Sequence, residues 1–243
     1  MRKFFNLFFL LFICFAYAIS SDKSVSVMKH AFQEEQKKAE KQLIVVIDPG
    51  HGGRDPGKVG VNHILEKDVN LNISMRLKNL LEQNDFKVIM TRDTDIGLYN
   101  EGDSNKKRAD MYARVQMIKD SKADLAISIH QNSFTEEYVK GAQVFYFNKS
   151  SQGKKLAELL QKQIVETIAD GNHRKAKPND NYYMLKKTDC PLAIVECGYL
   201  SNIREAGLLS DEEYQEKMAY AIHLALIRFI NEGGLMQGEE KSS

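Results

Sequence analysis

The chain has little of what marks several other classes of protein. Of its 243 residues only three are cysteine and four are proline, and the formal net charge is only +1. A chain so close to neutral gives no indication of nucleic-acid binding or of a partner held by bulk charge. No internal repeat and no interdomain linker is visible, and a hydrophobic fraction of 43% is sufficient for one sizeable core.

The long apolar run of the sequence is confined to its N-terminus. Two basic residues precede the run, which closes with the small-x-small pattern Ala16-Tyr17-Ala18. This order is typical of a secretory signal peptide in residues 1–20. The alternative is an uncleaved membrane anchor, because the run is only slightly shorter than a spanning helix. Both alternatives place the rest of the chain outside the cytoplasm.

Few cysteines remain for a protein in an oxidising compartment. After removal of the signal segment only Cys190 and Cys197 are left. The residues between them form an apolar run that predicts a strand, and an extended strand holds its two ends beyond disulfide distance. We therefore expect two buried thiols.

Apolar strands alternate with amphipathic helices along the rest of the chain. Alternation of this kind predicts an α/β fold with a mostly parallel central sheet of about six strands and helices on both faces. We expect one catalytic domain over 43–233, preceded by a polar linker or loose helix over 21–42 and followed by a polar tail over 234–243. Strands are predicted at 43–48, 86–92, 123–130, 141–147, 182–187 and 192–197, and helices at 66–84, 104–120, 151–169 and 211–232.

Two of these helices allow more detailed predictions. The capping-box spacing of Ser210 and Glu213 predicts that the last helix begins at Asp211. The helix over 104–120 is expected to bury one face, formed by Ala109, Tyr112, Ala113 and Met117.

A loop dense in glycine and proline surrounds a single histidine, His51. Five of the fifteen glycines and two of the four prolines fall between Pro49 and Gly60. Such a loop forms neither helix nor strand, and it fixes the backbone of His51 before any ligand binds. This arrangement suits a side chain that must point at one place.

Other polar side chains are predicted at the same edge of the sheet. His130 and Glu196 each close a buried strand, and Glu66 begins the helix that leaves the His51 loop. Groups at the carboxyl ends of strands in an open α/β sheet form its functional site. Taken singly, the position of Glu66 is explained by the helix dipole, and that of His130 by ordinary packing. Burial of the Glu196 carboxylate in its strand, by contrast, costs free energy unless another group pairs with it.

Two imidazoles and one or two carboxylates are the ligand set of a catalytic zinc site, which keeps one position open for water. A carboxylate beyond the three ligands then serves as a base. The residues alone do not say whether Glu66 or Glu196 is the ligand.

The remaining histidines fit this site less well. His63 stands before the helix predicted over 66–84 and is kept as a spare ligand, while solvated or packing roles are expected for His30, His173 and His223. A competing interpretation is a phosphate-binding loop in Gly52–Lys58, which has the required glycine and lysine spacing. The following valine and the internal proline argue against it, because such a loop needs a Ser or Thr hydroxyl and free backbone N–H groups.

Together these motifs resemble one family, the zinc-dependent N-acetylmuramoyl-L-alanine amidases. The resemblance runs in order over nearly the whole domain. Its segments are VVIDPGHGGRDPG, EKDVNLNIS, SIHQNSF, GAQVFYF, PLAIVECGYLSN and YQEKMAYAIHLALIRF.

The resemblance implies one zinc ion per chain, held by His51, Glu66 and His130, with Glu196 as the catalytic carboxylate. It implies hydrolysis of the amide between N-acetylmuramic acid and the L-alanine of the peptidoglycan stem peptide. Asn132 matches a polar position of the family motif and is expected to contact substrate.

Within the family, two segments look most like the amidases of the spore cortex, TDIGLYNEGDSNKKRADMYARVQMIKDSKADLAISIHQNSF and KAKPNDNYYMLKKTDCPLAIVECGYLSN. That likeness implies a role in making muramic-δ-lactam, which germination requires, in the space where the cortex forms. Some family members carry a helix that blocks the zinc between the second histidine and the last glutamate. Here we expect only one helix and short strands in that interval, and therefore a separate activating protein. The rival is a non-catalytic wall-binding module on the same fold, against which Glu196 argues.

Overall fold

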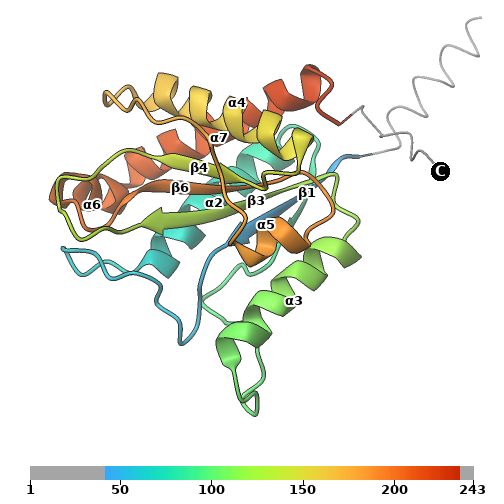
Figure 1. The fold of residues 1–243 in the computed structure, drawn as a ribbon, viewed down its shortest axis with the longest axis horizontal. Helices are drawn as coiled ribbons and strands as arrows, with labels where there is room; N and C mark the ends of the chain where they lie inside the picture. The colour runs from blue at the N-terminus through green and yellow to red at the C-terminus, as the bar shows by residue number, and fades with distance from the viewer. Residues whose placement is uncertain (1–41, 236–243) are drawn as a thin grey trace, which may run out of the picture. The chain divides into compact units, whose positions relative to one another are not determined.

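A computed structural model describes residues 42–235 of the chain (Figure 1). The predicted signal segment, most of the predicted linker and nearly all of the predicted tail lie outside these residues. Within the described range, no helix combines the length and the apolar character that crossing a membrane requires.

Six strands form one sheet, with β2 and β5 at its edges. The order across the sheet is β2-β1-β3-β6-β4-β5. Strands β2, β1, β3 and β6 run parallel, whereas β4 pairs with β6 in the antiparallel sense and β5 runs parallel to β4. The strands are β1 (Ile44–Pro49), β2 (Lys87–Met90), β3 (Leu125–Asn132), β4 (Gln143–Tyr146), β5 (Lys177–Pro178) and β6 (Leu192–Tyr199).

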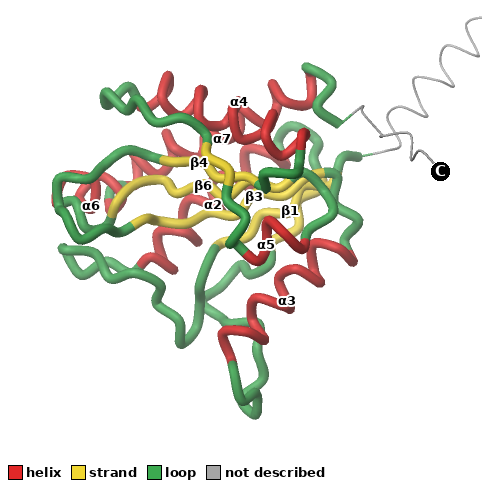
Figure 2. Tube along the Cα trace, in the orientation of Figure 1, coloured by secondary structure: helices red, strands yellow, loops and turns green. Residues whose placement is uncertain are grey.

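The helices cover both faces of the sheet, as the layers in Figures 1 and 2 show. Helix α7 lies against both α2 and α4, and these three helices pack on one face, whereas α3 and α5 pack on the other. This arrangement confirms the predicted α/β fold with a mostly parallel sheet. The helices are α2 (Glu66–Glu82), α3 (Lys106–Asp120), α4 (Ser151–Ile168), α5 (Tyr183–Lys187), α6 (Ile203–Ser210) and α7 (Glu212–Asn231).

The pleat of each strand divides its side chains between two cores. In β1, Val45 and Ile47 join the core under α2, α4 and α7, while Val46 joins the core under α3 and α5. All three are fully buried. The central strands are therefore apolar on both faces, which is why they appear in the sequence as continuous hydrophobic runs.

The predicted strand over 182–187 is wrong, because this segment is helix α5. The side chain of Asn179 accepts hydrogen bonds from the backbone N–H groups of Asn181 and Tyr182, which turns the chain before the helix. The adjacent Met184 and Leu185 are then both buried in the smaller core, whereas a strand would point them to opposite faces. The fifth strand is instead the short β5. The interval between His130 and Glu196 therefore holds two helices, not the single one expected.

The predicted last helix is present as α7, but its predicted capping box is wrong, because Ser210 ends a separate helix, α6. The hydroxyl of Ser210 donates to the carbonyl of Ala206. The cap of α7 is Asp211, whose carboxylate accepts from the backbone N–H of Tyr214. Helix α6 has a visible signature of its own, an asparagine N-cap at Asn202 followed three residues later by a glutamate.

Helix α3 is present, but its predicted buried face is wrong. Its buried residues are Arg114, Val115 and Ile118, and Tyr112 is 56% exposed. The helix turns this face inward because Arg114 forms an ion pair with a buried aspartate of β1.

Both remaining cysteines are free thiols, as expected. Cys197 is buried in β6, and Cys190 is only half-buried. Burial raises the pKa of the Cys190 thiol to about 12, which keeps it protonated and unreactive at neutral pH.

Candidate metal site

His51 lies in the first loop after β1, at the carboxyl edge of the sheet, with a left-handed backbone. Its φ is 61°, a conformation that costs a non-glycine residue roughly 1–2 kcal/mol. The nearby Gly57 has φ 67°, and a Cβ there would lie 2.6 Å from Glu66 Oε2 and 2.8 Å from the His51 ring. The glycine therefore allows the loop to pack directly against two of the predicted ligands.

Buried donors hold the carbonyl groups of this loop. Arg92 donates to the carbonyls of Pro49 and Gly50 at 3.0 Å each, and Arg114 donates to those of Pro49 and His51 at 2.8 and 2.7 Å. We call these two guanidinium groups and the three carbonyls they hold the carbonyl clamp. The clamp fixes three consecutive peptide groups and so supports the strained backbone of His51.

The clamp is anchored by Asp48 at the end of β1. Its carboxylate accepts hydrogen bonds from Arg114 at 2.7 Å, and from Thr91 and Ser128 at 2.6 Å each. Complete burial alone would raise the pKa of Asp48, but the charge of Arg114 and these hydrogen bonds hold it below its ordinary value. Asp48 is therefore ionised at neutral pH and balances the buried guanidinium.

The imidazole of His51 is oriented by a second carboxylate. His51 Nδ1 lies 2.8 Å from Asp55 Oδ2, and its Nε2 lies 3.2 Å from Glu66 Oε1. A carboxylate on one ring nitrogen fixes the tautomer and leaves the other nitrogen to act as a ligand. Partial burial alone would raise the pKa of Asp55, but the hydrogen bond and charge of His51 lower it.

Glu66 begins α2 and is 2% exposed. Its Oε2 accepts from the backbone N–H of Lys58 at 2.8 Å, and its Oε1 accepts from that of Gln131 at 3.1 Å. Burial alone would raise the pKa of Glu66, but hydrogen bonds with His130 and His51 hold it well below its usual range. The side chain is thus an ionised carboxylate in a fixed position.

His130 approaches the same carboxylate from β3. Its Nδ1 lies 3.0 Å from Glu66 Oε1, and its ring meets that of His51 edge-on with centroids 5.1 Å apart. A Cβ at Gly50 would lie 2.2 Å from the His130 ring, so only glycine allows this approach. Although burial alone would lower the pKa of His130, the hydrogen bond and charge of Glu66 raise it.

The three predicted ligands therefore converge. One ligand atom from each of His51, Glu66 and His130 lies within 4.8 Å of the others, a spacing that one metal ion can bridge. Two nitrogen donors and a carboxylate oxygen fit zinc, which binds three protein ligands in its catalytic sites. The donor set, together with Asp55 and the backbone N–H groups that hold it in place, thus fits the predicted cofactor.

Glu196 lies beside this cluster, at the position of β6 paired with His130 of β3. The register shifts directly after this pair, because β6 carries one extra residue before Tyr199 meets Asn132. Bulges of this kind re-aim side chains and are common beside active sites. The sequence did not predict the bulge.

The Glu196 carboxyl is largely without partners. It is 7% exposed, and its Oε1 accepts from the Tyr182 hydroxyl at 3.4 Å, while within residues 42–235 its Oε2 has no hydrogen-bond partner. Burial is the largest cause that raises the pKa of Glu196, and the negative charge of Glu66 raises it further. A buried acid with a raised pKa and an unpartnered oxygen is suited to accepting and releasing a proton.

The other residues named from the sequence are not part of this ligand cluster. Asn132 ends β3 two residues after His130, and its side-chain oxygen accepts from the N–H of Ser133. His63 is exposed in a turn before α2 and is not a member of the ligand cluster. His173 is exposed and His223 is buried in α7, whereas His30 lies outside the described residues.

The loop is not arranged as a phosphate cradle. The backbone N–H groups of Gly53 and Gly57 donate to Asp95 and Asp55, and that of Lys58 donates to Glu66. These donors are occupied by the protein's own carboxylates, and α2 begins only at Glu66. The structure therefore contradicts the phosphate-loop alternative.

Sequence reasoning missed Asp55, Tyr182 and the carbonyl clamp. The spacing of four residues between His51 and Asp55 on a turn was an available signal, since a carboxylate commonly supports a ligand histidine. No local pattern indicated Tyr182, because its hydroxyl reaches Glu196 only after α5 folds against the sheet.

An α/β sheet that gathers two imidazoles, a carboxylate and a buried protonatable acid at its carboxyl edge defines a metal-dependent hydrolase site. Comparison with known proteins agrees with this class. The N-acetylmuramoyl-L-alanine amidase family matches residues 45–228, and the chain therefore belongs to this family and is an amidase of that class.

Particular relatives extend the likeness over most of the domain. The germination-specific N-acetylmuramoyl-L-alanine amidase of Bacillus subtilis is 39% identical over 194 residues, which cover 79% of this chain and 81% of that protein. The CwlD amidase from Clostridioides difficile, solved in complex with the GerS lipoprotein, is 36% identical with a TM-score of 0.76 and covers 78% of this chain and 99% of that one. AmiC2 of Nostoc punctiforme is 33% identical with a TM-score of 0.68, covering 79% and 98% of the two chains.

Proposed function

We propose that the chain is a zinc-dependent amidase of the bacterial spore cortex. It cleaves the amide between N-acetylmuramic acid and the L-alanine of the stem peptide, with His51, Glu66 and His130 as the zinc ligands. The observation that carries the proposal is the convergence of these three donors beside the unpartnered oxygen of Glu196. A bound zinc ion supplies a Lewis acid that polarises the amide carbonyl and makes water more acidic.

The chain's own residues then carry the proton transfers. Glu196 accepts a proton from the attacking water at its unpartnered Oε2, and later gives it to the departing alanine nitrogen. The Tyr182 hydroxyl donates to Oε1 and keeps the carboxyl in one orientation. Asp55 holds the His51 ring, and the carbonyl clamp holds its backbone. Asn132, at the end of β3, contacts the substrate.

The spore-cortex role rests on the likeness to the germination-specific amidase of Bacillus subtilis and to the CwlD amidase. Removal of the stem peptide leaves the free lactyl carboxyl that muramic-δ-lactam formation requires. This role implies action outside the cytoplasm, where the cortex is assembled, with the N-terminal segment as signal peptide or anchor.

The activating protein remains a proposal. The expectation rested partly on a single helix in the interval before Glu196, and the structure places a second one, α5, there. Support now comes from the CwlD amidase, which was solved with a lipoprotein bound. We propose that a separate protein binds this chain and activates it.

Substitution of Glu196 by glutamine tests the proposed reaction against the non-catalytic wall-binding alternative. The variant should bind zinc as the natural protein does, and release of L-alanine amino groups from peptidoglycan should fall by at least about a hundredfold. Metal content by mass spectrometry and amine release measure the two effects separately. Glu158→Gln, at a surface carboxylate of α4, is the matched control and should hydrolyse normally. Normal hydrolysis by Glu196→Gln would show that the mechanism is wrong.

A further inference from the structure

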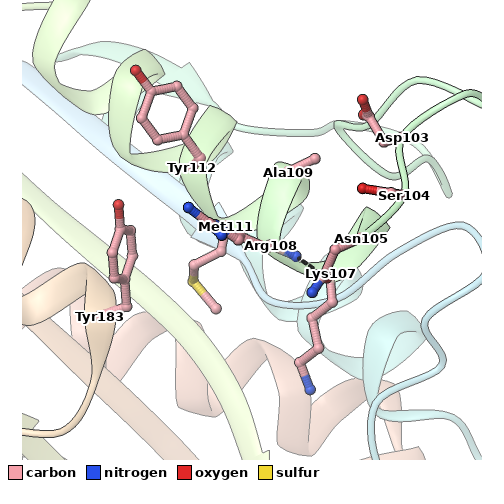
Figure 3. Close-up of a pocket in the computed structure, with 9 residues that line it drawn as sticks. All are labelled: Asp103, Ser104, Asn105, Lys107, Arg108, Ala109, Met111, Tyr112 and Tyr183. Carbon is pink, nitrogen blue, oxygen red and sulfur yellow. Dashed lines mark hydrogen bonds between the residues drawn. The ribbon is translucent and has the colours of Figure 1, made fainter.

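A groove lies between helices α3 and α5, on the side of the sheet that carries the smaller core. Its volume is about 760 Å³, and it is lined by the first turns of α3, by the loop before that helix and by Tyr183 of α5. Figure 3 shows Tyr112 and Tyr183 on one side of the view, with Asp103 and Lys107 on the other. The groove was not predicted, because the sequence analysis placed Tyr112 in the core.

The groove adjoins the metal site through two of its residues. Tyr183 directly follows Tyr182, whose hydroxyl contacts Glu196. On the other wall, the charge of Lys107 acts on Asp55, the carboxylate that orients His51. A substrate with its scissile amide at the metal site can therefore extend one arm into this groove.

The groove carries positive charge that the protein does not neutralise. Within residues 42–235, neither the Lys107 ammonium nor the Arg108 guanidinium forms an ion pair, whereas the neighbouring Lys106 lies 2.5 Å from Glu101. The carboxylate of Asp103 also lines the groove, but it accepts from the backbone N–H of Asn100 at 2.7 Å. Among the described residues, the groove is therefore lined by two cations without an ion pair and by one carboxylate that already accepts a hydrogen bond.

The groove also exposes aromatic surface. Tyr112 is 56% and Tyr183 is 40% exposed, and they come from different helices. Large exposed rings beside a charged cavity are typical of recognition sites, where a ring covers an apolar part of the ligand and polar groups fix its orientation. The combination fits a ligand with a short apolar backbone and a free carboxylate.

We propose that this groove binds the stem peptide of the substrate, and that Lys107 and Arg108 recognise a free carboxylate on that peptide. The inference rests on the proposed amidase function and names a determinant of its specificity. The stem peptide begins at the amide that is cleaved, and its second residue, a glutamate, carries a carboxylate that some bacteria convert to an amide. Lys107 and Arg108 of the groove supply the positive charge that such a carboxylate requires.

A matched pair of muropeptides tests the proposal, one with the free carboxylate at the second residue and one with the corresponding amide. For the variant with both Lys107→Gln and Arg108→Gln, KM for the carboxylate substrate should rise roughly fivefold with kcat unchanged, since solvent-exposed ion pairs are individually weak. KM for the amide substrate should not change. Lys106→Gln, which removes a neighbouring cation already paired with Glu101, is the control and should leave both values unchanged.

Two results would overturn the proposal. If the double variant has natural KM values for both substrates, the cations do not contact the peptide. If KM rises by the same factor for both substrates, the two cations do not recognise the carboxylate of the second residue. Calorimetric binding of the same two muropeptides to Glu196→Gln gives a second measurement that does not need turnover. Failure of the natural protein to cleave either muropeptide or intact peptidoglycan would instead contradict the proposed function.

Discussion

Arg114→Gln is the substitution that tests most of the architecture around His51. The guanidinium of Arg114 is almost completely buried and contacts two carboxylates, those of Asp48 and Asp110, at 2.7 and 2.6 Å. It also holds the carbonyls of Pro49 and His51. Glutamine cannot reach all of these groups, so the substitution leaves a buried carboxylate uncompensated and releases one side of the carbonyl clamp.

The size of the effect follows from these contacts. Removing one partner of a buried ion pair costs about 3–5 kcal/mol. For a domain of this size, each kcal/mol lowers the melting temperature by roughly 2–4 °C, so we expect a decrease of about 6–20 °C. Loss of a contact that orients a metal ligand typically weakens metal binding by about 10–100-fold, and we expect the zinc affinity of the variant to fall by such a factor.

Thermal melting by circular dichroism and competitive zinc titration measure the two effects. In the double variant Asp48→Asn/Arg114→Gln the buried charge is gone, so stability should partly recover while zinc affinity stays low. Lys119→Gln, which removes a surface ion pair on the same helix, should change stability by less than about 1 kcal/mol. If Arg114→Gln melts lower but binds zinc with natural affinity, the clamp does not position His51.

Three further predictions concern single positions. Gly50→Ala should lower the stability by about 1–3 kcal/mol and also lower the zinc affinity, because the new Cβ would clash with the His130 ring. Thermal melting and zinc titration measure the two effects, and natural values in both would contradict this packing. Gly207→Ala, an exposed helical position with open space around a Cβ, should instead stabilise the protein by roughly 0.5–1 kcal/mol, which chemical denaturation measures. Asp48 has a lowered pKa in the folded state, so its contribution to stability is complete above about pH 5 and is lost as the pH falls below its unfolded value of 3.8. The difference in unfolding free energy between the natural protein and Asp48→Asn should therefore shrink in acid. A difference that increased in acid would show that folding does not lower the pKa of Asp48.

The positions of the main site residues could be predicted because they depend on the sheet. Parallel strands bring their carboxyl ends to one edge, so His51, His130 and Glu196 are neighbours whatever the details of the loops. Glu66 follows from the same rule, because α2 begins at that edge. Sequence spacing could not separate the proposed ligand Glu66 from the proposed base Glu196, two carboxylates that differ in their hydrogen-bond partners.

The missed features depend on contacts between residues far apart in the sequence. Arg114 is an apparent surface residue of an amphipathic helix until Asp48 is known to lie beneath it, and this single pair turns α3 so that Tyr112 is exposed. The segment after Asn179 contains aromatic residues that favour a strand, yet burial of Met184 and Leu185 in one core makes it helical. In both cases tertiary packing outweighs local preference.

Zinc titration of the metal-free protein tests the central claim most directly. The account predicts one tightly bound ion per natural chain, and much weaker binding when His51→Ala, Glu66→Gln or His130→Ala is introduced. His63→Ala, at an exposed histidine outside the cluster, should bind zinc as the natural protein does. Unchanged binding by the three ligand variants, or the absence of a bound ion in the natural protein, would contradict the account.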